Sequence, residues 1–478
     1  MSGDRGRTES AMSSSSSSSA GGWVAMVPVV KGSRSSLAAG TRGSYQSTSS
    51  GMSSASASTT TAASDPAGAC AISPLLAGSV AGVLAATAAE RIAFKMLVDR
   101  LTPYRLVLAE TILVVSVCVY GLITVLKRGM TNRITSQMSL FPHSKLIIMA
   151  LLDTIQFSCL VVAGAGVTPT MTVILLHAST PALVFGSKFI FPERNYTDQQ
   201  VRGVYLIIAS LVISLGQQAS SLSSSSSSNT FSGALSSFIY VGAAALHGLS
   251  NLYKEHALVE WMQPVDVHFL NSWLFFYQAI ICIVLAPAIY ALQGLTAPAS
   301  GPGFPLSSMF VNIQDGRVCV HGQDPLWIAG GIDDDESRVA VQRSYDTKYT
   351  ECSHSFWLVL LFVVSNVGVL ECVDRILQTG NQMLGRATSA AVLVAFVTLG
   401  VYDLQADVGS GLFGTTIGVT DVLSLIVLLG GLELYGRDST NNDGIQLVQL
   451  TQSDFGSISA GGGSGSGEGG GGGGRAGP

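Results

Sequence analysis

Residues 145–165 of this chain read KLIIMALLDTIQFSCLVVAGA, and this stretch decides the class of fold. Beyond the lysine that opens it, Asp153 is its one charged residue. A helix rises about 1.5 Å per residue, so about 20 apolar residues are enough to cross the hydrocarbon of a bilayer. In lipid every backbone polar group needs a partner within the protein, and a helix provides one. The stretch therefore predicts a transmembrane helix.

The same character recurs along the whole chain. Of its 478 residues, 12% are charged and 47% are hydrophobic, whereas a soluble domain carries about 25% charged residues. Nine further apolar stretches have the length of a membrane span: 73–98, 104–126, 168–191, 200–218, 231–253, 267–292, 355–378, 383–404 and 413–435. We therefore expect an all-α fold, a polytopic membrane protein with ten transmembrane helices.

Low-complexity sequence surrounds and interrupts the apolar part. Residues 1–71 are rich in Ser and Thr, and residues 438–478 end in Gly and Ser repeats. Such segments bury too little apolar surface to offset the entropy of ordering, so both are predicted to be disordered tails. The serine run 220–228 is interpreted as a loop. These boundaries predict one ten-helix domain over residues 72–437.

Lysine and arginine are unevenly distributed between the predicted connections. With the N-terminus in the cytosol, the cytosolic side would hold Lys127, Arg128, Arg133, Lys145, Arg194, Arg202, Lys254, Arg375 and Arg386. The short loops on the other side would hold little beyond Arg100 and Arg105. Basic residues are retained on the cytosolic side of membrane proteins. Both tails are therefore expected in the cytosol, and the loop 294–354 on the opposite side.

Ten spans divide naturally into five plus five. An odd number of spans per half makes two similar halves enter the membrane in opposite senses, which is the design of an inverted repeat. The expected halves are residues 72–218 and residues 230–437. The segment that begins at Gly166 resembles the one that begins at Gly380, and they open the fourth and the ninth spans respectively. We therefore expect two inverted five-helix repeats.

Several classes of protein lack support in the sequence. No Lys/Arg cluster indicates nucleic-acid binding, and no Cys or His spacing indicates a metal or another cofactor. There is no HExxH helix, no placed Gly-x-Ser-x-Gly elbow and no paired catalytic Asp motif. No TVGYG-like filter favours a channel. We therefore do not expect an enzyme, and an intramembrane enzyme is the less favoured alternative to a transporter.

Polar and ionisable side chains inside the spans are the candidates for function, because each needs a partner or lies on a solute pathway. Glu90 and Arg91 in the first span either line a cavity or form an ion pair that holds helices together. Asp153, with Gln156 on the same face of its helix, is the best candidate for a cavity carboxylate and for proton coupling. Its alternative role is an acid hydrogen-bonded to a neighbouring helix.

Further candidates lie in the fourth and eighth spans. His177 is either a titrating group or a neutral histidine satisfied by a backbone carbonyl. Pro181 is interpreted as a kink that leaves carbonyl groups free. Asn366 is expected to face the cavity. Glu371 and Arg375, spaced i,i+4, are expected to pair along their own helix.

Motifs in a characteristic order run from the first span to the loop before the eighth. They are Glu90-Arg-Ile-Ala-Phe-Lys with Tyr104 and Glu110, Leu152-Asp153, Gly164 to Thr170, Ser250-Asn-Leu-Tyr-Lys-Glu255, Asp266-Val-His-Phe-Leu-Asn271, Phe276-Tyr-Gln278, and Asn312-Ile-Gln-Asp-Gly316 with Cys319 and Cys352. These segments resemble the chloroquine-resistance-transporter-like (CRT-like) family of the drug/metabolite transporter superfamily. The resemblance covers residues 73–437, and the serine-rich inserts depart from it. Within the motifs, Asn251, Asp266, Asn271 and Gln278 are interpreted as structural residues.

The resemblance implies a secondary transporter with a central cavity lined by helices one to four and six to nine. Its relatives move amino acids, peptides or thiols such as glutathione across organellar membranes. We therefore expect a small organic solute as the partner, with proton coupling left open. The alternative is a nucleotide-sugar or phosphate-sugar carrier of the same superfamily, which would need a cavity rich in lysine. The solute, the coupling ion and the oligomeric state stay open.

Two cysteines and the N-terminal composition bear on location. Cys319 and Cys352 share the loop 294–354, where an oxidising lumen would allow a disulfide, the alternative being two free thiols. The family resemblance favours the bond. A vacuolar or similar endomembrane fits it, and a plastid envelope is the alternative because the N-terminus is rich in serine with scattered arginine.

Overall fold

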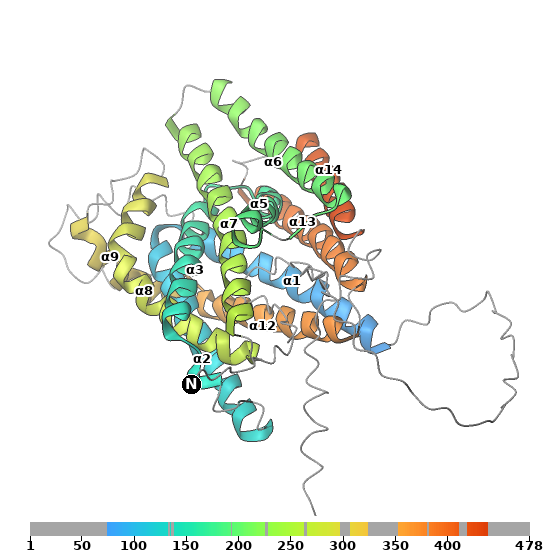
Figure 1. Ribbon diagram of the computed structural model, residues 1–478. Helices are drawn as coiled ribbons and strands as arrows, with labels where there is room; N and C mark the ends of the chain where they lie inside the picture. Colours follow the sequence, from blue (N-terminus) through green and yellow to red (C-terminus); the bar gives the residue numbers. More distant parts are fainter. Residues whose placement is uncertain are drawn as a thin grey trace, which may run out of the picture.

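The computed structural model describes residues 74–131, 134, 138–192, 194–224, 228–261, 265–296, 306–323, 352–379, 382–410 and 418–437. Throughout these residues the chain forms helices joined by short turns (Figure 1). The all-α polytopic fold predicted from the apolar stretches is therefore confirmed. The two predicted tails, residues 1–71 and 438–478, lie outside the described residues.

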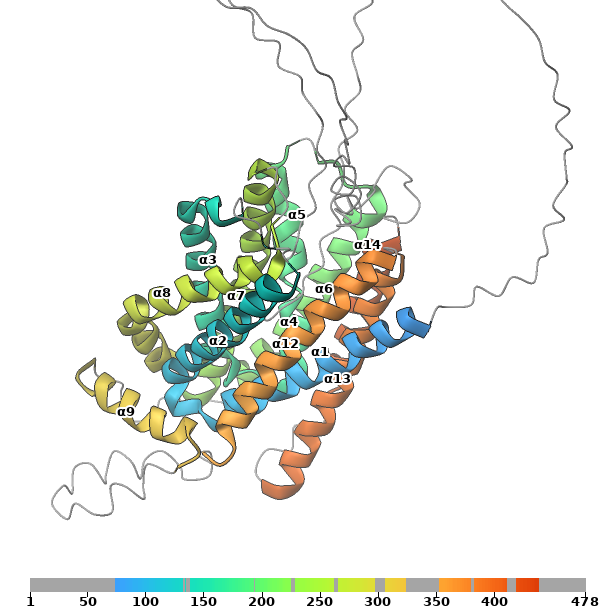
Figure 2. The ribbon, with the colours of Figure 1, turned by 90° about the horizontal axis from the view of Figure 1, so that it is seen from below.

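Ten helical segments correspond in order to the ten predicted spans. They are α1 (Pro74–Arg100), α2 (Arg105–Thr131), α3 (His143–Gly164), α4 (Pro169–Leu176) with α5 (Ser179–Ile190), α6 (Asp198–Ser224), α7 (Ser228–Trp261), α8 (Val267–Thr296), α12 (Ser355–Thr379), α13 (Gln382–Ser410) and α14 (Val419–Arg437). Within the described residues, nine segments are both long and apolar enough to cross a membrane. The tenth, α1, has the length but carries more charge, and it packs along α12 (Figure 2).

Helix packing follows the pattern of two repeats. Counting the spans from one to ten, the main packing pairs are one with eight (α1 and α12), three with six (α3 and α7), two with seven (α2 and α8), and five with ten (α6 and α14). If each span of the first half is exchanged for the span five later, and each span of the second half for the span five earlier, every pair becomes a pair of the same set. An exchange of the two halves therefore preserves the packing, as expected for inverted five-helix repeats.

The fourth span is broken where the sequence predicted a kink. Helix α4 ends before His177 and α5 begins at Ser179. Pro181 has no N–H group with which to bond the carbonyl of His177, and its ring would clash with that carbonyl in a continuous helix. The amide of Thr180 bonds this carbonyl instead, at 3.1 Å. The prediction that Pro181 interrupts the span agrees with this geometry.

The fifth and tenth spans meet through glycine. A Cβ atom added at Gly203 of α6 would lie 2.7 Å from the carbonyl oxygen of Gly431 in α14. Only a residue without a side chain permits this approach, in which small residues let two membrane helices pack closely. The α6–α14 pair lies at one side of the bundle (Figure 1). It therefore closes the periphery and leaves the centre to other helices.

Two predicted loops differ from the structure. The helix α6 continues to Ser224 and α7 already begins at Ser228, so most of the serine run is helical and not a loop. Continuation of the helix satisfies backbone groups that a loop would leave open, and serine costs a helix little. The loop 294–354 contains a further helix, α9 (Met309–Val320), after a short 3-10 turn at Leu306–Ser308.

Candidate functional site

A small pocket lies where the two repeats meet. The helices that line it are α2, α3, α8 and α12, which are the second, third, seventh and eighth spans. Its lining residues are Ile112, Leu113, Ser116, Gln156, Phe157, Phe275, Gln278, Phe362, Val363 and Asn366. They combine aromatic and aliphatic surface with a few neutral polar groups, and none of them carries a charge. This composition is typical of a site for a small organic molecule.

Gln156 is the unusual member of this lining. Its side chain is fully buried, yet neither its amide nitrogen nor its amide oxygen has a hydrogen-bond partner among the described residues. A buried polar group without a partner costs about 1–3 kcal/mol, so such groups are rarely left unsatisfied. The amide presents one donor group and one acceptor group to the pocket, where water or a solute can bond them.

A buried ion pair supports one side of the pocket. The carboxylate of Asp153 in α3 lies 2.7 Å from the ammonium group of Lys254 in α7, and both side chains are 1% exposed. Ser250 donates a hydrogen bond to the same carboxylate at 2.6 Å, and the amide nitrogen of Gln278 donates another at 3.0 Å. Asp153 therefore holds α3, α7 and α8 together, and it reaches the pocket only through Gln278.

A second polar cluster supports the opposite side. Asn366 in α12 donates a hydrogen bond to the carboxylate of Glu90 in α1 at 3.1 Å, and it accepts one from the Tyr120 hydroxyl of α2 at 2.9 Å. All three side chains are buried. Asn366 lines the pocket, so Glu90 also acts on the site through a neutral neighbour.

The two clusters occupy repeat-related helices. The Asp153 cluster joins the third, sixth and seventh spans, and the Asn366 cluster joins the eighth, first and second. Exchange of the halves therefore relates the helix of Asp153 to that of Asn366, and the helix of Lys254 to that of Glu90. The repeats share the arrangement of their polar groups but differ in the charge.

Two other predicted residues lie outside the pocket lining. Arg91 and His177 are partly buried and do not line it. His177 follows the last residue of α4, at the break in the fourth span. The charge of Arg91 is close enough to act on both His177 and Tyr240 of α7. These side chains therefore mark the contact of α1 with the fourth and sixth spans.

Charged residues close the bundle where α2 ends and α8 begins, a region we call the Lys127 end. Glu371 of α12 lies 2.7 Å from His268 and 3.7 Å from Lys127, and Lys127 lies 3.9 Å from Asp266. Asp266 also caps α8 by accepting a hydrogen bond from the amide of His268 at 2.9 Å. The pairs of Glu371 with His268 and Lys127 thus join different helices, and the charge of Arg375, one turn further along α12, acts on Glu371 as well.

Hydrogen bonds to uncharged acceptors close the opposite end of the same helices, which we call the Arg105 end. The buried guanidinium group of Arg105 donates hydrogen bonds to the carbonyl of Val162 at 2.6 Å and to the Thr296 hydroxyl at 2.7 Å. Gln293 donates to the carbonyl of Pro103 at 2.6 Å. The starts of the second span and the ends of the third and seventh therefore meet here.

Sequence reasoning missed the partners in these clusters. It assigned Lys254 and Arg105 to loops, whereas α7 extends to Trp261 and both side chains are buried. The spacing of Ser250 and Lys254, one helical turn apart, is the signal that could have placed them on one face. Two other residues of the motifs, one in α7 and one in α8, are buried as well. Asn251 bonds His247 at 3.1 Å, and Asn271 is fully buried outside the pocket lining.

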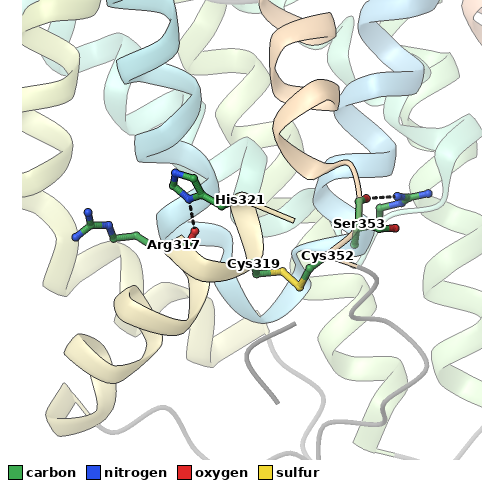
Figure 3. Close-up of a disulfide and its surroundings, with 6 residues drawn as sticks. Arg317, Cys319, His321, Cys352 and Ser353 are labelled. Atoms are coloured by element: carbon green, nitrogen blue, oxygen red, sulfur yellow. Dashed lines mark hydrogen bonds between the residues drawn. A yellow bond between two sulfur atoms is a disulfide. The ribbon is translucent and has the colours of Figure 1, made fainter. Parts of the chain in front are cut away.

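A disulfide fastens α9 to the start of α12. Cys319 and Cys352 are bonded, with 4.8 Å between their Cα atoms (Figure 3). Beside it, the Arg100 side chain donates a hydrogen bond to the carbonyl of Ser353 at 3.0 Å, which connects the end of α1 to the same segment. Within the described residues, Cys118, Cys159, Cys282 and Cys372 are free thiols.

Comparison with known proteins extends along the whole helical domain. A model of the CRT-like, chloroquine-resistance transporter-like family matches residues 76–435. The chain is 24% identical to Crt homolog 1 of Dictyostelium discoideum over 346 residues, which are 70% of this chain and 69% of that protein. It is 22% identical to Crt homolog 3 over 64% of this chain and 60% of that protein. It is 27% identical to Crt homolog 2 over 44% of this chain and 40% of that protein.

Proposed function

Because the chain belongs to the CRT-like family and is therefore a multi-pass membrane transporter, we propose that it moves small organic solutes across an organellar membrane by alternating access. The solutes we propose are amino acids, short peptides or thiols such as glutathione. The observation that carries the proposal is the neutral pocket between repeat-related helices, with the unpartnered amide of Gln156 in its lining.

The closures above and below this pocket support alternating access. Each closure joins helices of both repeats, the Lys127 end through ion pairs and the Arg105 end through hydrogen bonds to uncharged groups. A carrier of this kind opens one closure at a time around a central site. The pocket lining holds no lysine, which argues against a sugar phosphate as the solute.

Uptake by the full-length protein in liposomes tests the proposal. Glutathione, leucine and trialanine should be compared as labelled solutes, each with and without a pH gradient. We expect at least one of them to enter faster than in protein-free liposomes and to be displaced by an excess of the unlabelled compound. Equal entry of all three into liposomes with and without protein would contradict the proposal.

We further propose an endomembrane such as the vacuole as the location, with both tails cytosolic and the loop 294–354 in the lumen. The distribution of basic residues supports this orientation, and the Cys319–Cys352 disulfide fits an oxidising lumen.

The disulfide provides a direct test of this placement. In protein from native membranes, alkylated without reduction, mass spectrometry should find Cys319 linked to Cys352, because a lumenal bond persists while cytosolic thiols stay reduced. Cys118 and Cys372, which are free thiols, should carry the alkyl label under denaturing conditions. Recovery of both loop cysteines in alkylated form would contradict the proposed lumenal loop.

A further inference from the structure

Glu110 of α2 is a carboxyl inside a membrane span that has no basic partner. It is partly buried, and its Oε2 atom is buried without a hydrogen-bond partner among the described residues. The thiol of Cys282 in α8 is its polar neighbour, and Ser158 of α3 adjoins that thiol. In the described part of the chain no lysine, arginine or histidine acts on Glu110. Arg105, five residues earlier on α2, is engaged by Val162 and Thr296.

Asp421, in the first turn of α14, likewise has no basic neighbour among the described residues, but its carboxylate accepts a hydrogen bond from the amide of Gly418. Other carboxylates in the bundle differ from Glu110 because a basic side chain lies beside them. Those with a basic neighbour are Glu90 beside Arg91, Asp99 with Lys95, Asp153 with Lys254, Glu255 with Arg194, and Glu371 with Lys127 and His268. A buried ionised carboxylate is very costly unless it is paired. Ionisation of Glu110 therefore costs free energy that the paired carboxylates do not lose. Binding of a proton neutralises the carboxylate and removes this cost.

The position of Glu110 lies between the pocket and the Arg105 end. Along α2 it falls between Arg105 and Ile112, and its neighbour Cys282 falls between Gln278 and Gln293 along α8. Ser158 falls between Gln156 and Val162 along α3. One flanking residue in each helix lines the pocket: Ile112, Gln156 and Gln278. The other flanking residue takes part in the Arg105 closure: Arg105, Val162 and Gln293. Opening of that closure would expose Glu110 to water.

We propose that Glu110 is the carboxyl that carries the coupling proton during transport. This inference rests on the transport proposed above and specifies its coupling. The carboxylate takes up a proton when the Arg105 end is open, stays neutral while both ends are closed, and releases the proton when the pocket opens at the Lys127 end. One proton crosses per cycle, and no other bond changes. Asp153, whose charge Lys254 already balances, needs no proton to stay buried.

Two transport assays on the full-length protein in liposomes test this role. The probe is whichever of glutathione, leucine and trialanine shows uptake. Exchange of labelled for unlabelled solute at equal pH measures the solute cycle, and accumulation driven by an imposed pH gradient measures coupling. We expect Glu110→Gln to retain exchange and to lose gradient-driven accumulation, falling to the level without a gradient. Glu110→Asp should restore accumulation, and the exposed Glu260→Gln should behave as the wild type.

The outcomes separate this inference from the proposed transport. Absence of exchange by the wild type with any probe would contradict the transport itself. Exchange by the wild type without gradient-driven accumulation, or accumulation that survives in Glu110→Gln, would overturn the role of Glu110 alone.

A measurement on the wild-type protein does not depend on the folding of a variant. Dicyclohexylcarbodiimide reacts with protonated carboxyl groups in apolar surroundings, and mass spectrometry locates its adduct. We expect the adduct at Glu110 and loss of gradient-driven accumulation in parallel with labelling. Full loss of accumulation with Glu110 unlabelled would overturn the proposal.

Discussion

Replacement of Lys254 by Met should cost the folded transporter about 3–5 kcal/mol, because it leaves the Asp153 carboxylate buried without its counter-ion. Asp153→Asn should also destabilise the protein, since it leaves the ammonium group buried. The double variant, in which both charges are gone, should recover most of the stability, because neutral residues of similar size can replace a buried pair. The melting temperature of the purified protein in detergent measures these effects.

The chain offers a matched control for this experiment. Lys145 and Glu260 also join α3 to α7, at 2.8 Å, but the glutamate side chain is 60% exposed. Exposed ion pairs contribute little, so Lys145→Met should leave the melting temperature nearly unchanged. An equal fall in melting temperature in Lys254→Met and Lys145→Met would show that burial does not make the Asp153–Lys254 pair more important for stability than an exposed pair. A double variant no more stable than the single ones would contradict charge compensation.

Gln156→Leu should reduce solute uptake by about ten- to hundredfold, because loss of a buried hydrogen-bonding group costs about 1–3 kcal/mol. The folded protein should not lose stability, since the amide has no partner among the described residues that would be left unsatisfied. Uptake of the transported solute by liposomes, normalised to the amount of folded protein, measures the first effect. The melting temperature in detergent measures the second.

Asn271 is the control for Gln156. It is likewise a fully buried amide without a partner among the described residues, but it does not line the pocket. Asn271→Leu should therefore keep uptake near the wild-type rate. A similar loss of uptake in Gln156→Leu and Asn271→Leu would show that replacement of any buried amide lowers uptake, whether or not it lines the pocket. Undiminished uptake in Gln156→Leu would contradict the proposal that the solute binds in this pocket.

The candidate site was only partly visible in the sequence. Gln156 and Asn366 were predicted as site residues because they are polar residues in apolar runs, and both line the pocket. Gln278, which was interpreted as a structural residue, lines it as well. The expectation that Asp153 itself lines a cavity does not match its place behind Gln278. Its partner Lys254 was assigned to a loop because a lysine near the end of a span has the same local pattern whether it reaches water or a buried acid.

The sequence by itself determined the order of the spans, the break at Pro181 and the family. These features follow from local properties: lengths of apolar runs set by the thickness of the bilayer, the missing N–H of proline, and short motifs in a characteristic order. Only the tertiary structure decided which charges are neutralised. Asp153 has Lys254 and Glu371 has His268, whereas Glu110 has no basic partner within the described residues. Coulomb energy depends on distances between helices far apart in the chain, and no local pattern contains those distances.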